Sequence, residues 1–169
     1  DRFKGKTITN YIPRNESQNR AKNFCIDFVK SIDTNLANGV SALFYGSYGL
    51  GKTHLSTAIA YEVMKSGKTA RYTTVSNMFS EIRSTYGGRG SELSALRAFQ
   101  NVDFLVLDEL GVQNGTADEA RLLTDVLNGR YANMKSTFVL SNLEISEIEK
   151  ILTPRILDRL RENGGKAIK

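Results

Sequence analysis

Eight consecutive residues have the types and spacing of a loop that binds a nucleotide polyphosphate. The run Gly-Ser-Tyr-Gly-Leu-Gly-Lys-Thr, residues 46–53, matches the pattern G-x-x-x-x-G-K-[ST] in full. Glycines let the backbone turn successive N–H groups onto one phosphate, the lysine reaches the β- and γ-phosphates, and the final hydroxyl binds Mg²⁺. The pattern predicts that ATP or ADP binds here with Mg²⁺, with Lys52 on the phosphates and Thr53 on the metal.

Two carboxylates follow a second informative run. Residues 102–107 are apolar apart from Asp103, and Asp108 and Glu109 come directly after them. A buried strand that ends in an acid places the carboxylate at the sheet edge where a phosphate loop also lies, so we expect Asp108 to bind Mg²⁺. Glu109 is suited to deprotonate a water that attacks the γ-phosphate. The alternative is that both acids only hydrate a strand end.

Further polar groups follow in the C-terminal third of the chain. Asn142 comes after the mainly apolar run 137–141, where its amide would hydrogen-bond both the γ-phosphate and the attacking water. A polar turn residue is the alternative. Arg155 and Arg159 fall on one face of a short helix, and a guanidinium is suited to the phosphate charge of a transition state. The alternative for these arginines is a solvated cationic helix.

The elements that must position these groups alternate between strands and helices. Continuous apolar or β-branched runs predict strands at residues 40–45, 69–75, 102–107 and 136–141. Apolar spacing and capping signals predict helices over 16–38, 52–65, from Ser76, from Ser91, over 118–133, from a capping box of Ser146 and Glu149, and from Thr153-Pro154 to Asn163. Strands that are apolar throughout are buried on both faces, so we expect an α/β fold with a parallel sheet between helical layers.

Composition narrows the class of protein. The 169 residues, 40% of them hydrophobic, suit one domain with a substantial core. The single cysteine, Cys25, excludes an intramolecular disulfide and predicts a buried thiol in a reducing compartment. No apolar run is long enough to cross a membrane, so we expect a cytoplasmic protein. The net charge of +5 and the pI near 9.4 favour a polyanionic partner such as nucleic acid.

The order of the motifs resembles the AAA+ ATPases and, more narrowly, the bacterial and phage replicative helicase loaders of the DnaC/DnaI type. The resemblance extends over nearly the whole chain from about Phe3 and is strongest in three segments, Gly-Lys-Thr-His-Leu at 51–55, Asn-Val-Asp-Phe-Leu-Val-Leu-Asp-Glu-Leu-Gly-Val-Gln at 101–113 and Arg-Ile-Leu-Asp-Arg-Leu at 155–160. It implies a P-loop AAA+ (ASCE) three-layer α/β/α domain with a parallel sheet of about five strands. Residues 1–169 would form one ATPase domain with a truncated C-terminal part. A last strand, the sensor 2 helix and an N-terminal helicase-binding domain are expected outside the chain.

The resemblance also implies roles for individual residues. Asp108 and Glu109 would be the Walker B acids, Asn142 sensor 1, and Arg155 an arginine finger that acts on a neighbouring subunit, with support from Arg159. Tyr11 and Ile12, within a lead-in of residues 1–15, would line the adenine pocket. The residues expected at the nucleotide are then Tyr11, Ile12, Gly46, Ser47, Tyr48, Gly49, Leu50, Gly51, Lys52, Thr53 and His54. Tyr48 departs from the wider family, which often has proline at that position.

A DNA contact is implied for the segment 76–99, which would be the helical element that these proteins present to single-stranded DNA. Within and just beside its Gly-rich part, Arg83, Tyr86 and Arg89 combine cations with an aromatic ring, the mixture that binds a phosphate backbone and stacked bases. The alternative is a solvated loop.

The function that this resemblance implies is ATP hydrolysis coupled to loading of a ring-shaped replicative helicase onto single-stranded DNA. Self-association would bring Arg155 to the nucleotide of a neighbour. One alternative is a transposition helper ATPase of the IstB type, which shares the core and also binds DNA. Another is a P-loop small-molecule kinase, although Glu109 and Asn142 are better suited to water as the nucleophile.

Overall fold

Five parallel strands in the order β2-β3-β4-β1-β5 form the central sheet. The computed structural model describes residues 5–88, 90–112 and 114–169. The strands are β1 (Ala42–Phe44), β2 (Ala70–Thr74), β3 (Phe104–Leu110), β4 (Ser136–Ser141) and β5 (Lys166–Ile168). The first four confirm the strands predicted from apolar runs, and their parallel pairing confirms the predicted α/β class.

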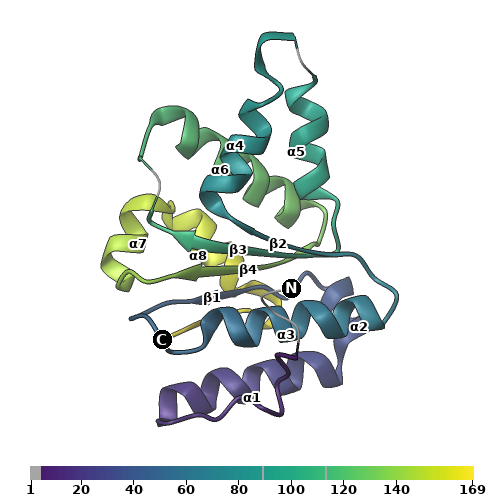
Figure 1. Ribbon diagram of the computed structural model, residues 1–169, viewed down its shortest axis with the longest axis vertical. Coiled ribbons are helices and arrows are strands. Elements are labelled where there is room, and N and C mark those ends of the chain that lie inside the picture. The colour runs from purple at the N-terminus through teal and green to yellow at the C-terminus, as the bar shows by residue number, and fades with distance from the viewer. Residues whose placement is uncertain (1–4, 89, 113) are drawn as a thin grey trace.

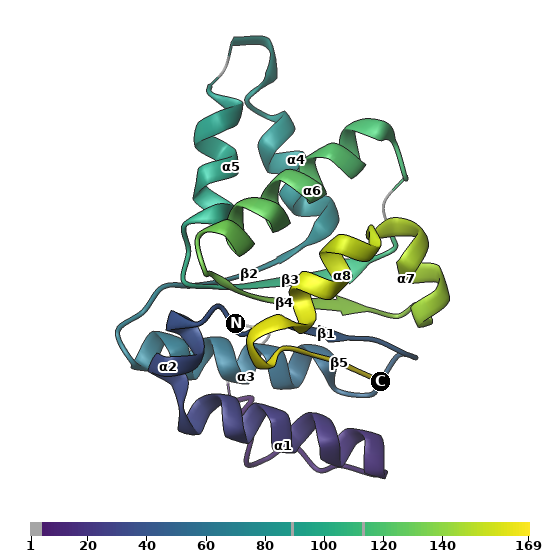
Figure 2. The same ribbon diagram turned by 180° about the vertical axis from the view of Figure 1, so that it is seen from behind.

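Helices cover both faces of this sheet, as Figures 1 and 2 show from opposite sides. One layer contains α1 (Glu16–Lys30), α2 (Ile32–Ala37) and α3 (Lys52–Lys65). The other contains α4 (Val75–Arg83), α5 (Glu92–Gln100), α6 (Ala117–Ala132), α7 (Ile145–Ile151) and α8 (Pro154–Arg161). Short 3₁₀ turns lie at Tyr86–Gly88 and Glu162–Gly164. The three layers agree with the predicted α/β/α arrangement. Within the described residues, no helix is long and apolar enough to span a membrane.

Side chains alternate along the strands and so divide the core into two halves. On β3, Phe104 belongs to the core beneath α1 and α3, whereas Leu105 belongs to the core beneath α4 to α8. The first half is rich in aromatic rings, and the centroids of Phe104 and Phe138 lie 4.8 Å apart. Cys25 is fully buried there, as predicted, and burial raises the pKa of its thiol.

The prediction of one continuous helix over residues 16–38 is wrong, because the chain divides at Ser31 into α1 and α2. Ser31 has φ −121° and ψ 41°, which lie outside the helical region. The apolar spacing of α1 continues past Ser31 because Leu36 of α2 is buried in the same core as α1. Periodicity therefore gave no sign of the break.

Two predicted caps were also wrong. Thr74, rather than Ser76, caps α4, and its hydroxyl accepts from the N–H of Asn77. The capping box of α7 is formed by Glu144 and Glu147, two residues before the expected pair. Glutamate is an unusual N-cap, so the sequence pattern did not point to it. Thr153 caps α8 with Pro154 in its first turn, as predicted.

A last strand is present within the chain, contrary to the prediction that it would lie beyond Lys169. β5 pairs with β1 at the edge of the sheet. It contains only three residues, Lys166–Ile168, and follows directly on Gly164 and Gly165. So short a segment shows no periodicity, which explains why the sequence did not reveal it.

The helices α4 and α5 form a hairpin that projects from the sheet (Figure 1). Arg130 of α6 is fully buried at its base and donates to the carbonyl oxygens of Phe99 at 2.7 Å, Val102 at 2.8 Å and Ser136 at 2.6 Å. Burial lowers the pKa of Arg130 to about 9, so the guanidinium stays charged at neutral pH. Arg130 therefore joins the end of α5 to the start of β4.

Candidate nucleotide-binding site

The predicted phosphate loop, residues 46–53, lies between β1 and α3 at the carboxyl end of the strand. Gly46, Gly49 and Gly51 have φ values of +106°, +78° and +85°, in the left-handed range that favours glycine. Tyr48, the residue at which the loop departs from the wider family, is 81% exposed. The loop leads into the N-terminus of α3, where N–H groups without helical partners favour a bound anion.

Lys52 is the first residue of α3, and its ammonium group lies back over the loop. Its Nζ donates to the carbonyl oxygens of Gly46 and Ser47, at 2.6 and 2.8 Å, and to Oδ1 of Asn142 at 2.9 Å. Partial burial lowers the pKa of Lys52, and the charge of Asp108 opposes that shift. The structure thus brings together Lys52 and Asn142, as the sequence predicted.

Asp108 joins the loop to the second motif. It is buried on β3, and its Oδ2 accepts a hydrogen bond from Oγ1 of Thr53 at 2.8 Å. Its Oδ1 accepts from the N–H of Glu109 at 2.7 Å. The two residues predicted to hold Mg²⁺, Thr53 and Asp108, are therefore in direct contact. Their hydroxyl and carboxylate oxygens are ligands that Mg²⁺ accepts.

Tyr72 is a member of this site that the sequence did not predict. It lies on β2, and its hydroxyl donates to Oδ2 of Asp108 at 2.8 Å. The parallel register pairs Thr74 with Asp108, so Tyr72 comes two residues earlier on the neighbouring strand. Only the register between β2 and β3 reveals this contact, because no sequence motif links the two positions.

Glu109 has an unusual backbone conformation for a residue with a side chain. Its φ is +60°, and β3 is irregular between Leu107 and Leu110. The side chain of Glu109 is exposed, whereas Asp108 before it and Leu110 after it are buried. Strained positions of this kind often occur at functional sites. Gln113, the last residue of the same motif, lies outside the described residues.

The lead-in of the chain packs along the loop and α3. Tyr11, expected at the adenine, is only 6% exposed, and its hydroxyl donates to the carbonyl oxygen of Leu50 at 2.6 Å. Ile12, expected beside it, is 81% exposed. His54 of α3 places Nε2 2.9 Å from the carbonyl oxygen of Thr7. The structure therefore brings Tyr11 and His54 to the loop, while an adenine contact of Tyr11 and Ile12 stays a prediction.

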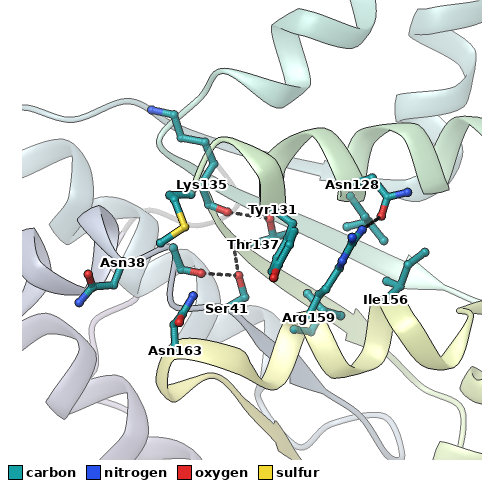
Figure 3. A pocket seen from close by; sticks show the side chains of 13 residues that line it. Asn38, Ser41, Asn128, Tyr131, Lys135, Thr137, Ile156, Arg159 and Asn163 are labelled. Carbon is teal, nitrogen blue, oxygen red and sulfur yellow. Dashed lines mark hydrogen bonds between the residues drawn. The ribbon is translucent and has the colours of Figure 1, made fainter.

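Arg155 and Arg159, expected on one face of a helix, have different surroundings in α8. Arg155 is exposed and forms no ion pair or hydrogen bond through its side chain within the described residues. The guanidinium of Arg159 donates to Oδ1 of Asn128 and lies 4.4 Å from the centre of the Tyr131 ring. Figure 3 shows Arg159 and Asn128 pointing toward each other beside a cavity of about 20 Å³, the room of about one water. Arg155, unlike Arg159, is available to a partner.

The residues expected at DNA lie at the hairpin, and two of them have partners within the molecule. Arg83 pairs with Asp118 at 3.0 Å and with Glu119 at 3.4 Å. The hydroxyl of Tyr86 lies 3.3 Å from a carboxylate oxygen of Asp118. Arg89 lies outside the described residues. A DNA contact of these three residues stays a prediction.

Known proteins are similar to this chain in sequence and in fold. YdaV of Escherichia coli (strain K12), described as uncharacterized, is 35% identical over 161 residues, which cover 95% of this chain and 63% of YdaV. The replicative helicase loader DnaC of the same strain is 34% identical over 156 residues, which cover 92% of this chain and 62% of DnaC. The chain thus spans less than two thirds of the length of these relatives.

A crystal structure of the DnaC helicase loader superimposes with a TM-score of 0.84 and 26% identity, covering 100% of this chain and 99% of that chain. This likeness confirms the predicted P-loop AAA+ fold and the resemblance to helicase loaders of the DnaC type. The family model described as IstB-like ATP binding protein matches residues 24–165. The chain therefore belongs to the IstB-like family of ATP-binding proteins.

Proposed function

We propose that the protein binds ATP with Mg²⁺ at the P-loop and hydrolyses it. The observation that supports this most directly is the 2.8 Å hydrogen bond between Thr53 and Asp108, because it joins the loop to the acidic motif at the place where a metal site is needed. Membership of a family of ATP-binding proteins also supports the proposal. Mg²⁺ bound there would neutralise charge on the phosphates.

In this proposal Glu109 is the general base. Its exposed carboxylate follows the buried Asp108 in the chain and takes a proton from the water that attacks the γ-phosphate. Lys52 exchanges the carbonyl oxygens that it contacts in this structure for oxygens of the β- and γ-phosphates. Asn142, 2.9 Å from Lys52, orients the same water and the γ-phosphate. A small-molecule kinase would instead transfer the phosphate to an acceptor.

Nucleotide binding is tested with Lys52→Ala, which removes the cation from the phosphate cradle. We expect no detectable binding of a fluorescent ATP analogue, while Lys68→Ala, an exposed lysine just beyond α3, binds like the wild type. Unchanged affinity in a folded Lys52→Ala protein would contradict the site.

Hydrolysis is tested with Glu109→Gln, measured as phosphate release in the absence of any acceptor. Loss of a general base lowers the rate by about 10²–10⁴-fold while ATP still binds. Equal loss of affinity and rate would show that Glu109 is a ligand or a structural residue. No phosphate release by the wild type unless an acceptor is added would favour the kinase.

We further propose that this ATPase domain belongs to a loader of a ring-shaped replicative helicase, and that the segment 76–99 faces single-stranded DNA. The similarity to DnaC in sequence and structure supports the loader. The IstB-like family model supports the transposition helper as the second candidate. ATP-dependent binding of the full-length protein to a replicative helicase is expected for the loader, and stimulation of a transposase without helicase binding is expected for the helper.

A further inference from the structure

The contact between Tyr11 and the P-loop is unusually close. The Tyr11 hydroxyl donates to the carbonyl oxygen of Leu50 at 2.6 Å, and Nε2 of Gln18 is a second, longer donor to the same oxygen at 3.4 Å. The ring packs directly on the next residue, since a Cβ added to Gly51 would lie 2.2 Å from Cε2 of Tyr11. Tyr11 is 6% exposed, and its hydrogen bond to Leu50 is partly buried.

The oxygen that Tyr11 holds belongs to the same peptide group as the N–H of Gly51. A peptide group is planar and trans, so its C=O and N–H point in opposite directions. Holding the oxygen of Leu50 therefore sets the direction of the Gly51 N–H. That N–H is one of the amides with which a P-loop surrounds a phosphate.

This peptide group needs an external anchor because glycine follows it. Gly51 has φ +85°, and glycine adopts positive and negative φ about equally well. A flip of the Leu50–Gly51 peptide is therefore sterically inexpensive, and it would point an oxygen at the phosphate in place of an N–H. The Tyr11 hydroxyl and the Gln18 amide stabilise the productive orientation.

We propose that Tyr11 is a positioning residue of the phosphate cradle, which acts by fixing the Leu50–Gly51 peptide so that its N–H faces the polyphosphate. This inference rests on the proposed function, nucleotide binding at the P-loop. It assigns Tyr11 to the phosphate end of the nucleotide through its hydroxyl. A contact between Tyr11 and adenine would instead use the aromatic ring, which a Tyr11→Phe variant retains.

The experiment compares Tyr11→Phe with the wild type, using ADP and inorganic tripolyphosphate, each with Mg²⁺. Tripolyphosphate has no base, so it reports on the cradle alone. We expect both dissociation constants to rise by the same factor, about 3- to 10-fold, because one hydrogen bond to the backbone is lost. Tyr61→Phe, which changes an exposed tyrosine of α3, is the matched control and should leave both unchanged.

A second measurement follows the cradle directly. In ¹⁵N NMR spectra, the chemical-shift change of the Gly51 amide on addition of tripolyphosphate should be smaller in Tyr11→Phe than in the wild type. Thermal unfolding shows that the variant is folded before either comparison.

Three results separate the possibilities. Weaker binding of ADP with unchanged binding of tripolyphosphate would mean that the Tyr11 hydroxyl contacts the nucleoside, and this would overturn the proposal. Unchanged binding of both ligands with an unchanged Gly51 amide response would overturn it as well. A wild-type protein that binds neither ligand would contradict the proposed function itself.

Discussion

At the scale of single residues, the carboxylate of Asp108 is held by hydrogen bonds from three other residues. Within the described part of the chain it accepts hydrogen bonds from Thr53 and Tyr72 on Oδ2 and from the N–H of Glu109 on Oδ1. An ionised carboxylate offers about four acceptor positions, so about one remains, on Oδ1, for a metal-bound water. A carboxylate fixed in this way needs little reorganisation when Mg²⁺ arrives with the nucleotide.

Tyr72→Phe tests this preorganisation. The variant keeps the ring on β2 but removes the donor to Asp108, so the carboxylate gains rotational freedom. We expect the Mg²⁺ concentration for half-maximal ATP binding to rise by about 3- to 10-fold, as the loss of one charge-assisted hydrogen bond predicts. Binding of ATP in the presence of a chelator should not change. An equal loss with and without Mg²⁺ would mean that Tyr72 supports the fold and has no effect through Asp108.

At the scale of elements, charged side chains fasten the α4–α5 hairpin to α6. Two arginines form ion pairs with four acids in this region. Arg83 pairs with Asp118 and Glu119. Arg121 pairs with Glu92, Asp118 and Asp125. Among the described residues of this cluster, the acids outnumber the arginines. DNA that bound Arg83 would have to replace carboxylates that are already within 3.4 Å of it.

Single-stranded DNA binding by the hairpin is tested with Arg83→Ala and Asp118→Asn. If Arg83 contacts phosphate, the first variant weakens binding and lowers the slope of log K against log salt by about 0.7, whereas the second strengthens binding because one competing carboxylate is neutralised. The measurement is a salt titration of fluorescence anisotropy, with Lys30→Ala on α1 as a control cation in the opposite helical layer. If neither variant changes affinity while both lower the unfolding temperature, Arg83 is an anchor of the hairpin only.

The elements that the sequence predicted well are those with long apolar runs, such as β3 and β4, because burial on both faces leaves a strong pattern. The break before α2 was missed because the apolar spacing continues across Ser31, and β5 was missed because three residues carry no period. The predicted caps of α4 and α7 were wrong because Thr74 and Glu144 occupy those positions. The candidate site follows the same rule. Fixed motif spacing predicted Lys52, and the ends of apolar runs predicted Asp108 and Asn142. Tyr72 depends on strand register, which no local pattern encodes.

At the scale of the whole molecule, the phosphate loop contacts Asp108 through Thr53 and Asn142 through Lys52, but Arg155 stands apart from them. Within the described residues, no hydrogen bond or ion pair joins Arg155 to the P-loop, and its side chain is exposed on α8. Arg159, one turn later, is occupied by Asn128 and Tyr131. An exposed, unpaired guanidinium at this position is suited to the nucleotide of a second copy of the chain.

We therefore expect hydrolysis to require self-association, with Arg155 acting in trans. An arginine finger contributes about 10³–10⁵ in rate, so Arg155→Ala should be nearly inactive while it still binds ATP. Lys52→Ala should also be inactive, but it keeps Arg155. A mixture of the two variants contains interfaces with an intact P-loop on one side and an intact Arg155 on the other. The mixture should therefore recover part of the wild-type phosphate release. In the wild type, the activity per subunit should rise with protein concentration. Arg161→Ala, which changes another exposed arginine of α8, is the matched control and should retain activity alone. A mixture that stays inactive, together with wild-type activity per subunit that is independent of concentration, would mean that Arg155 acts within its own subunit or only hydrates its helix.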